Sequence, residues 1–246
     1  HRLIRRQRQM CIRDRYFEEE PIFSCLTAAA CATEETESVS GDSYSFLETD
    51  DSVAMILSDG VGSGESAARD SGRIVDLTER ILDAGLGPDM AMLFLNGMAG
   101  AEGDENRMAT LDLCRIDLYR GECETVKAGG AAGFIKRSDR VEKIQSRQLP
   151  LGMSASEDIS EKKWQLNSGD LVILVSDGVV QNWPCGDGEY LLEQKIASLN
   201  VSSPVDLANL ILRYAIRQCG GKIRDDMTVL VTGIWKNEER EIEDIE

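Results

Sequence analysis

The sequence predicts an α+β fold built from antiparallel hairpins and from helices that come in pairs. Short apolar runs indicate buried strands, a block of short β segments fills the middle of the chain, and amphipathic helical patterns lie on either side of that block. Strands that come in runs, without strict alternation with helices, favour this class over a parallel doubly wound sheet. With 246 residues the chain is long enough to bury a substantial core.

The strands expected with the clearest pattern lie at residues 22–33, 53–57 and 171–175. The last two are continuous apolar runs, which are typical of strands covered on both faces. Both run directly into the tripeptide Ser-Asp-Gly, at 58–60 and at 176–178. The chain therefore places the same acidic turn at the end of two buried strands.

Three helices are expected from apolar positions that recur every three or four residues. Their faces are Ala67, Ser71, Ile74, Thr78 and Ile81 for the first, Ala91, Phe94, Leu95 and Met98 for the second, and Leu207, Leu210, Ile211, Tyr214 and Ala215 for the third. The third begins with Ser203, Pro204 and Asp206, which predict an N-cap, a first helical residue and a capping box. The Gly-Gly pair at 220–221 predicts its end.

The β segments between the second and third helices predict antiparallel hairpins. Arg-Gly, Gly-Gly and Ser-Asp turns separate them, and they lie at 108–119, 122–128, 133–137 and 141–145. A closing strand is expected at 226–235.

Composition excludes most kinds of catalytic site. The only histidine is His1, so a Ser-His-Asp triad, a Cys-His pair and a His-ligated zinc site are not expected. Seven cysteines without a CxxC pair favour free thiols in a reducing cytosol. A net charge of −17 argues against a nucleic-acid partner. Catalysis would then depend on carboxylates, hydroxyls, Lys or Arg, or on a metal held by oxygen.

The two ends of the chain are expected to lie outside the folded domain, which we place at 16–237. Residues 1–15 carry six Arg and one Asp and look like an adapter-derived or linker segment, while 238–246 form an acidic tail. No apolar run approaches the roughly 18 residues of a membrane span, so no membrane contact by this segment is expected.

Acidic residues stand at the ends of the predicted strands. Asp42 precedes a short strand, Asp59 and Asp177 each end a buried strand, and Asp225 and Asp226 precede the closing strand. Any one of them alone would be read as a turn or cap aspartate. Together, several buried carboxylates are costly unless cations neutralise them. Ligands that offer only oxygen point to Mg²⁺ or Mn²⁺.

These motifs, in their order along the chain, resemble the metal-dependent protein phosphatase (PPM) family, and more closely its stage II sporulation protein E branch. The matching segments are 39–46 (VSGDSYSF), 57–65 (LSDGVGSGE), 110–113 (TLDL), 116–119 (IDLY), 149–152 (LPLG), 175–179 (VSDGV) and 224–229 (RDDMTV). Each motif is weak alone, but the ordered combination is specific and spans most of the chain.

The resemblance implies a central antiparallel β-sandwich flanked by helix pairs, in αββα layers, with two Mn²⁺ or Mg²⁺ ions at one end. It implies that the metal ligands are Asp42, Asp59, Gly60 through its carbonyl, Asp177, Asp225 and Asp226, with Asp59 bridging both ions. Asp42, Asp59, Asp177 and Asp225 would be the catalytic set, and the division of roles between Asp225 and Asp226 stays open.

The same resemblance implies a function. It indicates a protein serine/threonine phosphatase in which two metals activate water, acting on a phosphorylated regulator of the anti-sigma-factor antagonist type in sporulation-type regulation. It also implies a cytoplasmic domain of a membrane-anchored parent protein, with a homodimer as one assembly. The helices at 65–83 and 88–101 would be either a switch that completes the metal site or simple packing helices.

Two other functions are compatible with parts of the sequence. A catalytically inactive domain of the same fold would serve in binding or regulation. Nucleotide binding is suggested by the GxGxxA pattern at 62–67, which follows a strand and precedes a helix. Against it, Asp59 at the strand end would repel a pyrophosphate, and no strand follows at the spacing of a βαβ unit.

Overall fold

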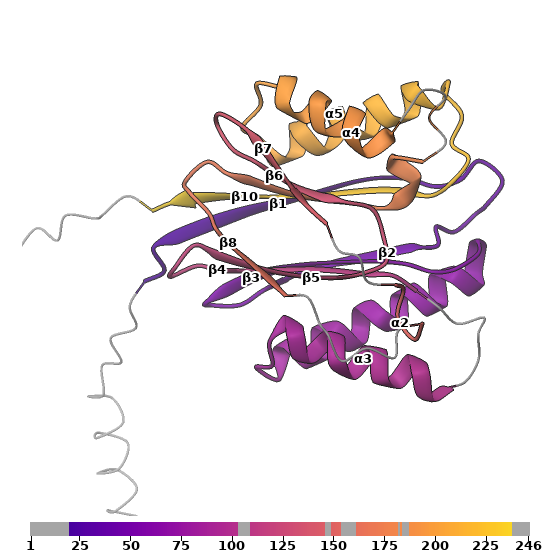
Figure 1. The fold of residues 1–246 in the computed structure, drawn as a ribbon, viewed down its shortest axis with the longest axis horizontal. Helices are drawn as coiled ribbons and strands as arrows, with labels where there is room; N and C mark the ends of the chain where they lie inside the picture. The colour runs from indigo at the N-terminus through magenta and orange to yellow at the C-terminus, as the bar shows by residue number, and fades with distance from the viewer. Residues whose placement is uncertain are drawn as a thin grey trace, which may run out of the picture.

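A computed structural model describes residues 20–102, 109–145, 149–153, 161–181, 183 and 187–237. Two five-stranded antiparallel sheets pack face to face, and a pair of helices covers the outer side of each (Figure 1). This αββα sandwich confirms the predicted fold class. Among the described residues no helix is both long and apolar enough to cross a membrane. The segments expected at 1–15 and 238–246 lie outside the described residues.

The first sheet joins the two ends of the domain, because the first and last strands along the chain pair with each other over their full length. The strand order is β1-β10-β9-β6-β7. The strands are β1 (Phe23–Ala32), β6 (Gly133–Lys136), β7 (Val141–Ile144), β9 (Leu171–Val175) and β10 (Met227–Lys236), and the covering helices are α4 (Gly188–Ser198) and α5 (Pro204–Gln218).

The second sheet has the order β2-β3-β4-β5-β8. Its strands are β2 (Asp42–Glu48), β3 (Ser52–Asp59), β4 (Leu111–Asp117), β5 (Glu122–Ala128) and β8 (Lys162–Gln165), and it is covered by α2 (Gly64–Asp83) and α3 (Pro88–Glu102). The interior strand β3 is buried over its length except at its last residue, Asp59. The sheet therefore holds that end firmly while leaving its carboxylate partly accessible.

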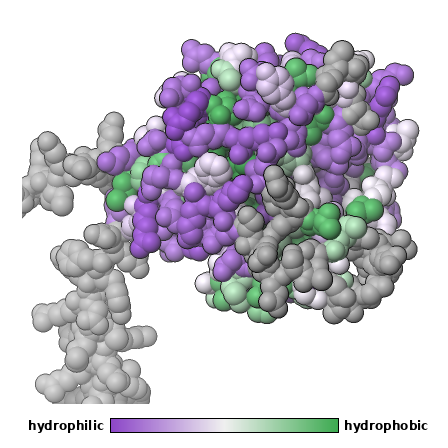
Figure 2. All heavy atoms as spheres, viewed as in Figure 1, coloured by the Kyte–Doolittle hydropathy of each residue, from purple (hydrophilic) through white to green (hydrophobic). Residues whose placement is uncertain are grey.

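Apolar side chains fill three layers, one between the sheets and one beneath each helix pair. Met55, Leu57 and Val172 lie between the sheets, and the opposite faces of β3 and β9 pack beneath the helices through Ile56 and Ile173. This burial on both sides is what the continuous apolar runs predicted. The face seen in Figure 2 is mostly hydrophilic, as expected for a chain with a net charge of −17.

The predicted start of the third helix is confirmed in α5. Ser203 is the N-cap, and its hydroxyl accepts a hydrogen bond from the Asp206 amide at 3.3 Å. Pro204 occupies the first turn, where its missing N–H costs nothing. The helix α4 and the strand β8 were not expected from the sequence. α4 is capped by Asp187, but its sequence has only a weak amphipathic pattern, and only Gly188, Leu192 and Ile196 of its residues are buried.

The predicted antiparallel hairpins are confirmed in β4–β5 and β6–β7, and the structure adds that the first belongs to one sheet and the second to the other. One expectation needs correction. In α3, Phe94 and Met98 were expected to face the core but are 48% and 38% exposed, while Met92 is buried with Ala91 and Leu95. α3 is apolar on nearly all sides, so periodicity could not identify its buried face.

Candidate active site

Two acidic residues meet at one end of the second sheet. Asp42 is the first residue of β2, Asp59 is the last residue of β3, and the antiparallel register places them directly opposite each other. Opposite residues on one face of such a pair have Cβ atoms about 5 Å apart. Strand pairing therefore brings together two carboxylates that are well separated in sequence.

The first sheet brings further acidic residues to the same place. Asp177 begins a short 3-10 turn, η1 (Asp177–Val179), directly after β9, and Asp225 comes just before β10. These strands are neighbours, and the Ser176 amide donates to the Thr228 carbonyl at 2.9 Å where they end. The predicted ligand residues from both sheets thus lie at one end of the sandwich.

The electrostatics of these carboxylates show how closely they are gathered. Burial raises the pKa of Asp42 to about 7, and the nearby charges of Asp226 and Asp177 add to the effect. Burial raises the pKa of Asp59 to about 9, with the charges of Asp42 and Asp177 adding to the effect. The pKa of Asp225 is raised by burial and by Asp177. Like charges that raise one another's pKa values must share one site.

The site fits hard divalent cations by its donor chemistry. Neither carboxylate oxygen of Asp42 has a hydrogen-bond partner, although both oxygens are buried. Such a group is costly unless a cation or a proton neutralises it. Within the described ranges, no group of three or more His, Cys, Asp or Glu side chains is arranged to hold a metal ion. The carboxylates described therefore act on one another electrostatically without being arranged round a single point.

Asp225 and Asp226 differ in what their side chains contact. Both oxygens of Asp226 accept backbone hydrogen bonds, from the Glu34 amide at 2.9 Å and from the Gly41 amide at 2.6 Å. Among the described residues, Asp225 accepts only from the Asp226 amide, at 3.0 Å, through Oδ1. The Asp226 side chain thus links the β1–β2 loop, which ends directly before Asp42, to the start of β10.

The two Ser-Asp-Gly turns need glycine because other backbone lies against them. A Cβ on Gly60 would lie 2.2 Å from the Ala67 carbonyl oxygen in α2, and one on Gly178 would lie 2.1 Å from the Asp226 carbonyl oxygen. In this structure these glycines let two segments of the protein's own backbone meet behind the acidic residues.

Several residues that support the site were not singled out from sequence. The Thr110 hydroxyl accepts from the Asp59 amide at 3.0 Å, and the Ser58 hydroxyl donates to the Thr110 carbonyl at 2.7 Å. Gln181 donates through its side-chain amide to Asp177. Thr110 and Ser58 stand in motifs quoted for the family resemblance, so a signal existed for them, whereas nothing in the sequence pointed to Gln181.

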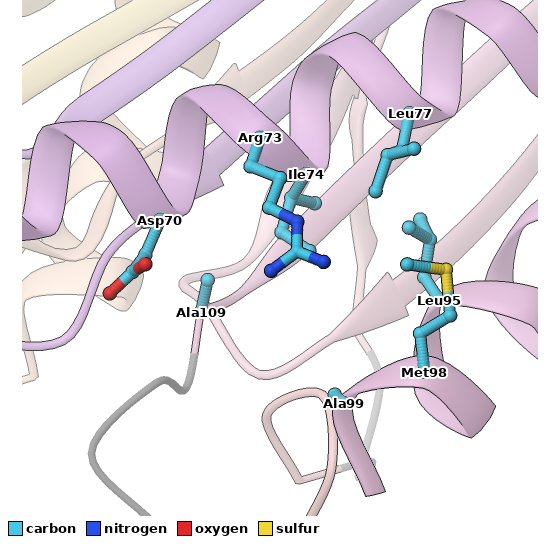
Figure 3. Close-up of a pocket in the computed structure, with 8 residues that line it drawn as sticks. All are labelled: Asp70, Arg73, Ile74, Leu77, Leu95, Met98, Ala99 and Ala109. Atoms are coloured by element: carbon cyan, nitrogen blue, oxygen red, sulfur yellow. The ribbon is translucent and has the colours of Figure 1, made fainter. Parts of the chain in front are cut away.

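A separate hollow lies between α2 and α3 and contains none of the predicted ligands (Figure 3). Its lining residues are Asp70, Arg73, Ile74, Leu77, Leu95, Met98, Ala99 and Ala109. The GxGxxA segment leads into α2, but β3 pairs antiparallel with β4, the next strand in sequence. The parallel βαβ unit of a dinucleotide-binding site is therefore missing here.

Comparison with known proteins agrees with this geometry. A family model described as stage II sporulation protein E (SpoIIE) matches residues 49–234. Stage II sporulation protein E of Bacillus subtilis is 36% identical over 213 residues, which cover 86% of this chain and 26% of that protein. Phosphoserine phosphatase RsbU of Bacillus subtilis is 24% identical over 78% of this chain and 59% of its own length.

A solved structure of the PP2C phosphatase domain with a fragment of the regulatory domain of SpoIIE from Bacillus subtilis superimposes with a TM-score of 0.83. It is 34% identical and the match covers 88% of this chain and 64% of that one. The chain spans about a quarter of the length of its Bacillus subtilis SpoIIE relative. Fold, family match and identity together show that the chain belongs to the stage II sporulation protein E family.

Proposed function

We propose that this domain is a protein serine/threonine phosphatase that uses two divalent cations, Mn²⁺ or Mg²⁺. The observation that carries the proposal is the convergence of Asp42, Asp59 and Asp177 from two sheets, with the Asp42 carboxylate buried and unpartnered. The fold supports it, since the matched SpoIIE structure is described as a PP2C phosphatase domain.

We assign the cation ligands to Asp42, Asp59, the Gly60 carbonyl, Asp177 and Asp225, with Asp59 placed to bridge two ions. Asp59 suits that role because the charges of both Asp42 and Asp177 act on it. Asp226 was expected among the ligands from sequence, but both its oxygens are occupied by backbone amides. We therefore assign Asp226 to positioning the loop that carries Asp42.

Two bound cations would supply a water molecule activated for attack on phosphorus and positive charge to stabilise the phosphoryl oxygens. The protein's own contribution is to hold the carboxylates at rigid strand ends, where they need little rearrangement. Thr110 holds the end of β3 and the Ser176–Thr228 pair holds the end of β9. The only histidine is His1, so the proposed reaction involves no phosphohistidine intermediate.

The substrate we propose is a phosphorylated regulatory protein of the anti-sigma-factor antagonist type, in sporulation-type regulation. The support comes from the relatives, one named for stage II sporulation and one named as a phosphoserine phosphatase. We further propose that the domain works in the cytoplasm as part of a larger, membrane-anchored protein. A binding or regulatory domain without activity is the second candidate, favoured by the absence, among described residues, of a closed metal cage.

Phosphate release from a phosphoserine peptide, with Mn²⁺ and again after EDTA, tests the proposal. We expect turnover that requires metal and that falls at least about a hundredfold in Asp59→Asn and Asp177→Asn. Asp139→Asn is the matched control, because Asp139 is exposed in the β6–β7 turn and its side chain contacts the exposed Arg140. Metal binding without turnover on any phosphoprotein would favour the binding domain, and full activity in Asp59→Asn would overturn the site assignment.

A further inference from the structure

The β1–β2 loop, residues 33–41, links the acidic end of the first sheet to the beginning of α2. We propose that Glu37 in this loop is a positioning residue, which holds the first turn of α2 against Gly60 and Gly41, beside the proposed ligands. The proposal rests on the function proposed above for that site and adds a residue to it. It does not make Glu37 a metal ligand.

One side of the loop is anchored on the segment that leads into β10 and carries Asp225. Asp226 accepts the amides of Glu34 and Gly41 at 2.9 and 2.6 Å. The Glu35 amide donates to the Ile223 carbonyl at 3.1 Å, and the Ile223 amide donates back to the Glu35 carboxylate at 3.3 Å. The loop is thus fixed to the first sheet at several points.

The other side of the loop meets α2 through the Glu37 carboxylate. The Ser63 hydroxyl donates to Glu37 Oε1 at 2.8 Å, and a Cβ on Gly64 would lie 2.7 Å from Glu37 Oε2. Ser63 is the N-cap of α2, yet its side chain makes no capping bond within the helix. Glu37 therefore places a negative charge at the positive end of α2, in place of an ordinary cap. Its own amide donates to the Glu34 carbonyl at 3.1 Å, which ties this contact to the anchored part of the loop.

The first turn of α2 packs directly on backbone of the metal site. Ala67 lies against Gly60, where a Cβ would come within 2.2 Å of the Ala67 carbonyl oxygen. Ala67 also faces Gly41, where a Cβ would lie 3.0 Å from the Ala67 Cβ. A shift of α2 at its start would therefore move Gly60, Asp59 and Asp42 relative to one another. Glu37 opposes that shift by tying the helix start to a loop fixed on the opposite sheet.

The test uses the whole chain with Glu37→Ala and Glu37→Gln, and with Glu65→Gln as matched control. Glu65 is exposed in the same first turn of α2, so its substitution removes the same charge from the same helix end without removing the link to Ser63. Three quantities are measured: Mn²⁺ affinity by calorimetry, hydrogen exchange of the amides of 64–68 in EDTA, and thermal stability.

For Glu37→Ala we expect Mn²⁺ affinity to fall about tenfold and exchange at 64–68 to speed up by a similar factor, the size of one lost charge-assisted hydrogen bond. The Mn²⁺ affinity and exchange rate of Glu37→Gln should lie between those of wild type and Glu37→Ala, because the Gln carbonyl can still accept from Ser63. For Glu65→Gln both quantities should stay within about twofold of wild type. Wild-type Mn²⁺ affinity in Glu37→Ala would overturn the proposal, and so would unchanged exchange at 64–68. A wild-type chain that binds no Mn²⁺ would contradict the proposed function instead, and the exchange measurement in EDTA would still decide whether Glu37 holds α2.

Discussion

Replacing Asp42 by Asn should stabilise the metal-free domain while it removes the proposed activity. Both Asp42 oxygens are buried and unpartnered, and burial raises the pKa of this carboxyl from 3.8 to about 7. That difference corresponds to about 4 kcal/mol of destabilisation at pH well above 7. The Asn amide also loses water on burial, which offsets part of this gain. We therefore expect Asp42→Asn to raise the free energy of unfolding by about 2 kcal/mol.

The sign of the pH dependence provides the sharper test. Because the pKa of Asp42 is higher in the folded state than in the unfolded chain, protonated Asp42 favours folding. That contribution is fully present below about pH 4 and is lost as the pH rises through about 7. The advantage of Asp42→Asn should therefore be small at pH 4 and should grow up to about pH 8.

Thermal unfolding in EDTA between pH 4 and 8 measures this effect. At pH 8 we expect Asp42→Asn to melt about 6 °C above wild type, and saturating Mn²⁺ to raise the melting temperature of wild type only. Asp139→Asn is the control and should follow wild type at every pH, since that side chain is exposed. A gain that stays constant across this pH range, or a loss at pH 8, would show that Asp42 is not a destabilising buried charge.

Two further sets of substitutions test a buried ion pair and a tight turn. Lys127 Nζ lies 2.5 Å from Asp112 Oδ2, and both residues are buried. Lys127→Met leaves the Asp112 charge uncompensated and should lower the free energy of unfolding by about 4 kcal/mol in chemical denaturation, while adding Asp112→Leu should restore most of that loss. A Lys127→Met variant as stable as wild type would contradict this. Gly178→Ala would place a Cβ 2.1 Å from the Asp226 carbonyl oxygen and should lower the free energy of unfolding by about 3 kcal/mol. Gly97→Ala is the control, because a Cβ there would meet no atom within 4 Å, and it should be neutral or stabilising. Equal stabilities of the two variants would show that the Gly178 turn can adjust.

The local part of this fold could be predicted because its signals are local. A continuous apolar run must be covered on both faces, so β3 and β9 were identified and Asp59 and Asp177 were placed at their ends. The capping residues of α5 were likewise read directly from neighbouring positions. The single histidine, a property of composition alone, was enough to exclude sites that depend on imidazole.

What the sequence could not determine depends on contacts between distant segments. Which hairpin joins which sheet is decided by how apolar faces fit together in three dimensions, and so β6 pairs with β9 rather than with β5. The different roles proposed for Asp225 and Asp226 follow from which of them lies under the Glu34 and Gly41 amides. Sequence alone determined the acidic residues at the strand ends. Only the tertiary structure decided which of them remain unpaired, because amides of the remote β1–β2 loop take up both oxygens of Asp226 and leave those of Asp42 without a partner.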